Sequence, residues 1–323
     1  MNAINVKGGE GLIYAVISDI HGNAPALRAV RRDAEAAGAE QFLLTGDYIT
    51  DLPYTREIYE TLRDLEHAVF VSGNRERYMD TLDPALRNRE QFASLFLTRE
   101  ALGEDGRSWV RALPCTARLF TPDGKKTIFL EHICEEFYGG GLHQVKTRLR
   151  PSMLSKAFPN GATRQETKEF AKLVLEQEAD LPALKKRVGA DVVLHGHNHM
   201  QYAVTVDGVL YVNPGACGQP LDHDTRAPYT LLRYEDGVFT AEERRVPYDI
   251  EGTVRECKAS QFYQEAETWC ELIFHNIRNS REFGSAFWKA LGEEEETARP
   301  VTDEQYNQAF RRALLRVKEK ASA

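Results

Sequence analysis

Three apolar runs near the start of the chain each end in a short polar motif. The first run, LIYAVI, is continuous and rich in β-branched residues, which is typical of a buried strand. Helical patterns follow the first two runs, at residues 24–37 and 55–65. This alternation predicts an α/β layered fold whose ligand site lies beyond the carboxyl ends of the strands. The runs are Leu12–Ile17, Gln41–Leu44 and Ala68–Val71, and the motifs after them contain Asp19, Asp47 and Asn74.

The middle of the chain adds two hairpins and one more strand. Pro122-Asp123-Gly124-Lys125 and Asp207-Gly208 are turn sequences, each between two apolar runs. His132 follows the first hairpin directly, and the strand at 191–194 leads into His195-Gly196-His197-Asn198-His199. The expected hairpin strands are Thr116–Phe120, Thr127–Leu130, Gln201–Val206 and Val209–Val212, and helical patterns cover residues 83–113 and 165–188.

Two further regions have less definite patterns. Residues 135–159 are irregular and contain Lys146, Arg148 and Arg150, which form either a cap that steers an anionic substrate or a solvated basic strip. Residues 254–323 are helical and charged, so we expect one domain over residues 1–250 and a C-terminal helical extension over 251–323. The expected buried positions of the extension are Phe262, Trp269, Leu272, Ile273, Phe287 and Leu291.

Composition excludes several classes of protein. With 42% hydrophobic and 28% charged residues, the 323-residue chain is typical of globular proteins. Its net charge of −8 makes a nucleic-acid surface unlikely, although bound cations would reverse the local field at a site. The sequence has no run of about 18 apolar residues, so we expect no membrane span. Its N-terminus has no apolar core of a signal peptide, so we expect no export. The five scattered cysteines form no C-x-x-C pair, which indicates reduced thiols and a cytoplasmic location.

The polar motifs contain the side chains that bind divalent cations. Asp19 and His21 are two residues apart, and on an extended strand end both would point to one side. His197 and His199 have the same spacing, Asn74 offers an amide oxygen, and Asp47 has two oxygens with which to bridge two ions. Two ions about 3.5–4 Å apart activate water and clamp phosphoryl oxygens. The motifs therefore predict a two-metal site for phosphate-ester hydrolysis.

Each motif alone has an ordinary structural explanation. An Asp-x-His pair is usually a surface or structural pair, and Gly-Asp or Gly-Asn after a strand is commonly a turn. A single histidine after a strand, such as His132, is more often hydrogen-bonded than metal-bound. Three histidines within residues 195–199 are much harder to explain in this way. The metal interpretation depends on all the motifs falling together at expected strand ends.

As an ordered set, the motifs resemble the calcineurin-like metallophosphoesterase superfamily, particularly its small bacterial and archaeal branch. The matching pieces are D-x-H-G-N at 19–23, G-D at 46–47, G-N at 73–74, His132, G-H-N-H at 196–199, N-P-G-A-C-G-Q-P at 213–220 and D-x-R-A-x-Y at 224–229. The resemblance spans about residues 12–235 and implies a four-layer αββα sandwich. It implies two ions of manganese, iron, zinc or a related metal, one held by Asp19, His21, Asp47 and His199 and the other by Asp47, Asn74, His132 and His197. His195 matches no ligand, and we expect it to support the site or end a strand.

Two positions depart from the family pattern. Arg75 stands where many members have a histidine that protonates the leaving group. Arginine is a poor acid but a good phosphate partner, so Arg75 either stabilises transition-state charge or merely pairs with Glu76 or another acid. The leaving-group proton would then come from water or another residue such as His223. Ile133 replaces the usual glycine after His132 and could reshape the pocket wall.

These residues lead to a functional hypothesis and one alternative. The expected activity is hydrolysis of a small phosphodiester, nucleotide or phosphomonoester through a hydroxide activated by two metals. Its expected catalytic residues are Asp47, Asn74 and Arg75, and its expected substrate-binding residues are Asn74, Arg75 and His223. The alternative is a weakly active or inactive protein of this fold that serves as a binding or scaffold module. The C-terminal helices could then offer a partner surface or a homo-oligomer contact. The segment Asn213-Pro214-Gly215 is expected mainly to form a tight turn beneath the site.

Overall fold

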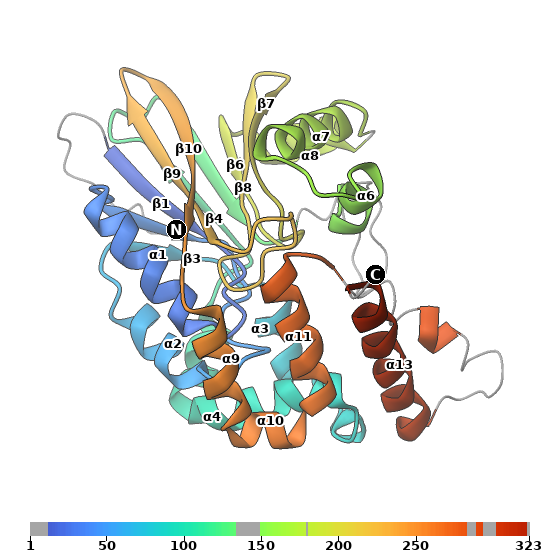
Figure 1. The fold of residues 1–323 in the computed structure, drawn as a ribbon. Coiled ribbons are helices and arrows are strands. Elements are labelled where there is room, and N and C mark those ends of the chain that lie inside the picture. The colour runs from blue at the N-terminus through green and yellow to red at the C-terminus, as the bar shows by residue number, and fades with distance from the viewer. Residues whose placement is uncertain (1–11, 134–148, 179, 283–288, 293–301, 322–323) are drawn as a thin grey trace.

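Two five-stranded sheets form the centre of the protein (Figure 1). The computed structural model describes residues 12–133, 149–178, 180–282, 289–292 and 302–321. The first sheet has the order β10-β9-β1-β2-β3 and the second β4-β5-β6-β8-β7. The strands of the first sheet are β1 (Leu12–Ile17), β2 (Gln41–Leu44), β3 (Ala68–Phe70), β9 (Ala227–Glu235) and β10 (Val238–Val246). Those of the second are β4 (Thr116–Phe120), β5 (Thr127–Glu131), β6 (Val192–Leu194), β7 (Gln201–Val206) and β8 (Val209–Pro214).

The sheets pack face to face, and helices cover their outer faces (Figure 1). Along β1, Tyr14 and Val16 belong to the core between the sheets, whereas Ala15 and Ile17 belong to the core beneath helices. This alternation follows from the two-residue period of a strand and explains why β1 is apolar on both faces. The four-layer αββα sandwich is therefore confirmed. The helices before residue 250 are α1 (Ala24–Ala36), α2 (Thr55–Arg63), α3 (Asn74–Asp80), α4 (Glu90–Ala112), α6 (Pro151–Ala157), α7 (Arg164–Glu176) and α8 (Leu181–Val188).

Parallel pairing brings the polar motifs together. In the first sheet β1, β2 and β3 are parallel, with Ile17 beside Leu44 and Leu44 beside Phe70. In the second sheet β5, β6 and β8 are parallel, with Leu130 beside Leu194. The carboxyl ends of parallel strands lie at one edge of a sheet, so each sheet delivers its motifs at one edge.

The helical regions differ in detail from the sequence expectations. A short 3-10 turn at Pro84–Leu86 precedes α4, so the long helix starts only at Glu90, and it kinks at Gly103. The expected helix over 165–188 is two helices, because Pro182 belongs in the first turn of α8 and would break a continuous helix. None of the helices described here has an apolar stretch sufficient to cross a membrane.

The C-terminal extension packs against the domain that precedes it. Its core includes Leu52 and Ala93 from the earlier part of the chain, together with residues from the helices after residue 250. Five of the six expected positions, Phe262, Trp269, Leu272, Ile273 and Leu291, are buried, and Phe287 lies outside the described residues. Lys146 and Arg148 also lie outside them, and Arg150 directly precedes α6. The helices of the extension are α9 (Ile250–Lys258), α10 (Gln261–Glu265), α11 (Glu267–Asn279) and α13 (Asp303–Ala321).

Candidate metal centre

The loop after β1 supplies the first two candidate ligands in an unusual backbone conformation. Asp19 and His21 have φ angles of 51° and 48°, in the left-handed region. The expectation that both sit on an extended strand end is therefore wrong. Instead, the Asp19 amide donates to the Gly46 carbonyl at 2.9 Å, and the His21 amide donates to the Asp47 carbonyl at 3.0 Å. These two hydrogen bonds hold the first loop against the second and aim both side chains at the same region.

Close approach of the loops explains the glycines in two of the motifs. A Cβ atom on Gly73 would lie 2.0 Å from Asp47 Oδ1, and one on Gly196 would lie 2.5 Å from Asp19 Oδ2. No side chain fits at either position without displacing a candidate ligand. The Gly-Asn and Gly-His motifs therefore reflect the packing of one loop on another.

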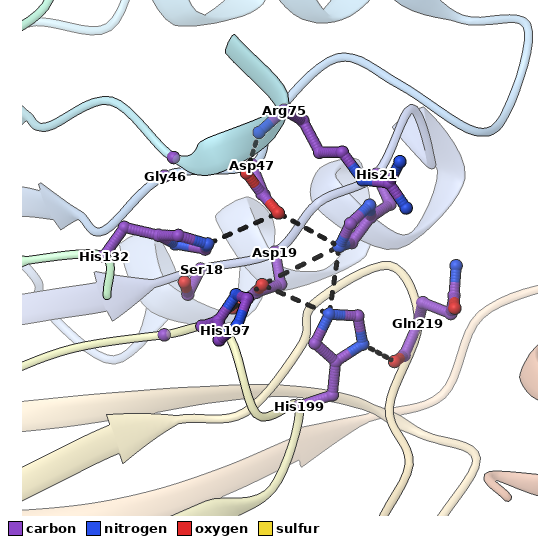
Figure 2. Close-up of polar contacts among 12 residues, drawn as sticks. Ser18, Asp19, His21, Gly46, Asp47, Arg75, His132, His197, His199 and Gln219 are labelled. Carbon is purple, nitrogen blue, oxygen red and sulfur yellow. Dashed lines mark hydrogen bonds and ion pairs between the residues drawn. The ribbon is translucent and has the colours of Figure 1, made fainter. Parts of the chain in front are cut away.

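One group of candidate ligands surrounds Asp19. His21 Nε2 and His199 Nε2 lie 3.7 and 3.3 Å from Asp19 Oδ1 and 3.1 Å from each other (Figure 2). Asp47 Oδ2 lies 3.9 Å from His21 Nε2 and 3.3 Å from His132 Nε2. Asp47 belongs to one of the two groups that could hold a metal ion, Asp19–Asp47–His132, and also lies near His21 of the other, Asp19–His21–His199, while Asp19 is common to both. The place of Asp47, near ligands of both groups, is the one that a bridging carboxylate would need.

The second group gathers around the amide of Asn74. Asn74 Oδ1 lies 3.1 Å from His132 Nε2 and 2.9 Å from His197 Nδ1. All seven residues expected to bind metal are buried or partly buried at this one place. Their carboxylate, imidazole and amide atoms form the mixed nitrogen and oxygen set that suits manganese, iron or zinc. The residues present therefore fit two such ions.

The far side of three imidazoles is held by an oxygen atom. The Nδ1 atoms of His21, His132 and His199 lie 2.8, 2.6 and 2.8 Å from Asp51 Oδ2, the Thr45 carbonyl and the Gln219 carbonyl. Each Nδ1 donates in this arrangement, so each Nε2 faces the centre and is the ring atom that can bind a metal ion there. The sequence offered little signal for these partners, since two act through their backbone. Asp51, which was missed, is an acidic residue in the same loop as Asp47.

Burial and neighbouring charges shift the pKa values of the cluster. Burial favours the neutral form of Asp19, but His199 and His132 outweigh it and hold the pKa of Asp19 well below its usual value. Burial lowers the pKa of His21, but hydrogen bonds to Asp19 and Asp51 outweigh it and raise that pKa to about 10. Burial, assisted by His132, lowers the pKa of His197 to about 3, which leaves its ring neutral. The carboxylates thus stay ionised and attract positive charge.

Arg75 lies at the edge of the cluster and does not pair with Glu76. Its Nη2 lies 3.6 Å from Asp51 Oδ2, and its backbone amide donates to Asp47 Oδ1 at 2.8 Å. Glu76 instead accepts from the backbone amides of Gly73 at 2.7 Å and Asp47 at 2.9 Å. The acid partner of Arg75 is therefore Asp51 and not Glu76, and a role of Arg75 in stabilising transition-state charge stays a prediction. Glu76 ties two ligand loops together, a role that the sequence did not indicate.

Other expected residues lie outside the ligand cluster. The His223 ring contacts the Ser155 hydroxyl at 3.0 Å and accepts from the Ala162 amide at 2.6 Å, so both of its ring nitrogens have partners. Its substrate-binding role stays a prediction. The Nε2 atom of His195 lies 2.9 Å from the Tyr202 hydroxyl, in keeping with a supporting role.

Two segments shape the surroundings of the cluster. Asn213 donates to the Gly196 carbonyl at 2.8 Å, which agrees with a structural role for the turn beneath the site. Ile133 and His132 line a cavity of about 210 Å³, so the residue that replaces the usual glycine forms part of a wall beside a candidate ligand.

Comparisons with known proteins agree with this geometry. A family model described as the calcineurin-like phosphoesterase superfamily domain matches residues 12–237. The uncharacterized protein MJ0912 of Methanocaldococcus jannaschii is 25% identical over 241 residues, which cover 74% of this chain and 88% of that protein.

Two solved structures share the fold. A metallophosphoesterase from Sphaerobacter thermophilus has a TM-score of 0.55 and 21% identity, with 83% of this chain and 99% of that chain covered. The hypothetical protein PH1004 from Pyrococcus horikoshii has a TM-score of 0.55 and 17% identity, with 80% and 97% covered. The family model includes every candidate ligand from Asp19 to His199, and the chain belongs to the calcineurin-like phosphoesterase superfamily.

Proposed function

We propose that this protein hydrolyses a small phosphodiester, nucleotide or phosphomonoester with the help of two divalent metal ions. The observation that carries the proposal is the place of the Asp47 carboxylate, 3.9 Å from the His21 imidazole and 3.3 Å from the His132 imidazole. A carboxylate with a separate set of donors on each side is suited to bridging two cations. Membership of the phosphoesterase superfamily supports the same conclusion.

The chain offers a donor set for each ion. Two such ions act as Lewis acids toward phosphoryl oxygens and lower the pKa of water. The proposed ligands of the first are Asp19, His21, Asp47 and His199, and those of the second are Asp47, Asn74, His132 and His197. Manganese, iron and zinc all accept this mixture of ligands.

Arg75 is the proposed phosphate partner. Its guanidinium points along the His21 side of the cluster (Figure 2) and is anchored on one side by Asp51, 3.6 Å away. Its remaining N–H groups can bind phosphoryl oxygens and stabilise the charge that develops on them. Because arginine keeps its proton, it does not protonate the leaving group. Esters with acidic leaving groups, which need no such proton, are therefore the favoured substrates.

The test is hydrolysis of bis(p-nitrophenyl) phosphate and p-nitrophenyl phosphate by the manganese-loaded protein. The wild type should turn over at least one ester and retain two transition ions per chain by elemental analysis. Asp47→Asn should lose both properties, whereas Asp64→Asn, at an exposed residue after α2, should keep them. A wild type that binds metal but hydrolyses neither ester would contradict the proposal and favour a binding or scaffold role.

A further inference from the structure

One face of helix α11, in the C-terminal extension, is directed at the metal centre. Trp269, Ile273 and Asn276 recur at the spacing of one helical face and are 5%, 1% and 3% exposed, and Ser280, directly after the helix, is fully buried. Two of these side chains are polar, so the face is not purely apolar packing. Trp269 lies near Arg75, which directly follows the candidate ligand Asn74, and Asn276 and Ser280 contact the segment between β8 and β9, which holds His199. All four residues follow the end of the family match at residue 237.

The first contact is with the proposed phosphate partner. The Arg75 guanidinium carbon lies 6.0 Å from the centre of the Trp269 ring. The guanidinium also contacts Asp51, whose carboxylate is hydrogen-bonded to His21. An aromatic ring and a carboxylate together restrict a long, flexible side chain to a small set of orientations. Trp269 therefore helps to determine where the N–H groups of Arg75 point.

The second contact reaches a metal ligand through one intermediate residue. The Asn276 side-chain amide donates to Gln219 Oε1 at 2.8 Å, and the Gln219 carbonyl accepts from His199 Nδ1 at 2.8 Å. Ser280 reinforces this contact, because its carbonyl accepts from the His223 amide at 3.0 Å. The end of α11 thus holds the loop that orients His199.

The two contacts reach the cluster at neighbouring residues, His21 and His199. Trp269 and Asn276 are seven residues apart, which in a helix is about 10 Å. The Nε2 atoms of His21, which Asp51 holds, and of His199 lie 3.1 Å apart. A single rigid helix therefore connects the phosphate partner to a metal ligand.

We propose that Trp269 and Asn276 are positioning residues for phosphate-ester hydrolysis, Trp269 through Arg75 and Asn276 through Gln219 and His199. This inference rests on the proposed function. In this proposal the C-terminal extension contributes residues that position the active site. A phosphoesterase domain that ended with the family match, at residue 237, would lack both residues.

The test of Trp269 compares Trp269→Leu with Phe274→Leu, at a fully buried position of the same helix and the same core. Trp269→Leu should lower kcat for bis(p-nitrophenyl) phosphate by about 2–30-fold, the range of a cation–π contact. Phe274→Leu should change kcat by less than about twofold when the folded fraction is equal. Trp269→Phe, which keeps an aromatic ring, should restore most of the activity.

A double-mutant cycle distinguishes positioning from general destabilisation. If Trp269 acts through Arg75, Trp269→Leu should have no further effect on kcat in an Arg75→Ala background. An equal effect in both backgrounds would contradict the proposal. The same would follow if Phe274→Leu and Trp269→Leu lowered kcat equally.

The test of Asn276 uses metal retention, which does not depend on turnover. Asn276→Ala should weaken manganese binding by about tenfold, the lower end for loss of a partner of a metal-bound histidine. The matched control is Asn279→Ala, at an exposed position of the same helix, which should bind manganese as the wild type does. Equal affinity in all three proteins would overturn this half of the proposal.

Phosphate binding separates this inference from the proposed function. Inorganic phosphate is titrated by calorimetry into manganese-loaded wild type and Trp269→Leu. If the wild type binds phosphate but hydrolyses neither ester, the hydrolase proposal fails, and weaker binding by Trp269→Leu still supports a positioning role. Equal phosphate affinity in the two proteins would overturn that role, and a wild type that neither binds nor hydrolyses would contradict both proposals.

Discussion

At the scale of single residues, three imidazoles of the site each have an oxygen partner on the side away from the centre, and we expect this partner to fix the orientation of the ring. Asp51 Oδ2 lies 2.8 Å from His21 Nδ1 and 3.6 Å from Arg75 Nη2, and the Asp51 side chain is 1% exposed. One carboxylate thus orients a proposed ligand and the proposed phosphate partner together. Loss of such a partner usually weakens metal binding by 10–100-fold.

We therefore expect Asp51→Ala to weaken manganese binding by about 10–100-fold. It should also raise KM, because Arg75 loses its anchor. Equilibrium dialysis with elemental analysis measures the first effect and ester hydrolysis the second. Asp64→Ala serves as the exposed control. Unchanged affinity in Asp51→Ala would show that His21 is oriented by the rest of its loop.

Asp222 gives a prediction about pH that does not involve the metal centre. Its buried carboxylate pairs with Arg245 and, at 2.9 Å, with Arg164. Burial raises the pKa of Asp222, but the two arginines outweigh it and hold the pKa below its usual value. Since the folded-state pKa is lowered, the stabilisation is present above the unfolded pKa of about 3.9 and is lost as pH falls toward the folded value.

Asp222→Asn should therefore lower the free energy of unfolding by about 3–5 kcal/mol at pH 7, because it leaves buried Arg245 without its charge partner. The difference from the wild type should shrink as pH falls below about 4. Urea unfolding at both pH values measures it. A difference that is the same at pH 7 and pH 3 would show that hydrogen-bond geometry, not charge, is what Asp222 contributes.

At the scale of elements, the sequence predicted strands and their motifs better than the loops between them. The run at 12–17 and the hairpin turns follow from local composition, and β1 and both hairpins match their expected positions. The left-handed backbone at Asp19 does not follow from local composition, because a hydrogen bond to the Gly46 carbonyl, in another loop, stabilises it. Glu76 was missed for the same reason, since its partners become neighbours only after the sheet forms.

The contact between loops can be tested at Gly73. An alanine Cβ would lie 2.0 Å from Asp47 Oδ1, so Gly73→Ala must move the proposed bridging carboxylate. A displacement of about 1 Å typically costs on the order of 100-fold in rate, which is the loss in kcat/KM that we expect. Gly292→Ala is the control, since a Cβ there meets no atom within 4 Å. Near-normal activity of Gly73→Ala would mean that the loops can separate without loss of the site.

At the scale of the whole molecule, the boundary expected near residue 250 marks a change of architecture but not a break in packing. Leu52, from a ligand-bearing loop, and Ala93, from α4, share a core with Leu272 of α11. The sequence could indicate which positions of the extension are apolar. It could not indicate that they would meet Leu52, because that contact joins segments more than 200 residues apart. A homo-oligomer contact through these helices stays a prediction.

Because the extension shares a core with a ligand-bearing loop, we expect the extension and the metal centre to unfold together. Leu272 is fully buried, and Leu272→Ala should lower the free energy of unfolding by about 2–5 kcal/mol. Because the extension holds Arg75 and His199, loss of helicity by circular dichroism and release of manganese should move to the same lower urea concentration. Leu184→Ala, at a fully buried position of α8 on the other outer layer, controls for destabilisation from a distance. If the helices of the mutant melted first while manganese stayed bound, the extension would be an independent unit, and α11 could not be what positions the active site.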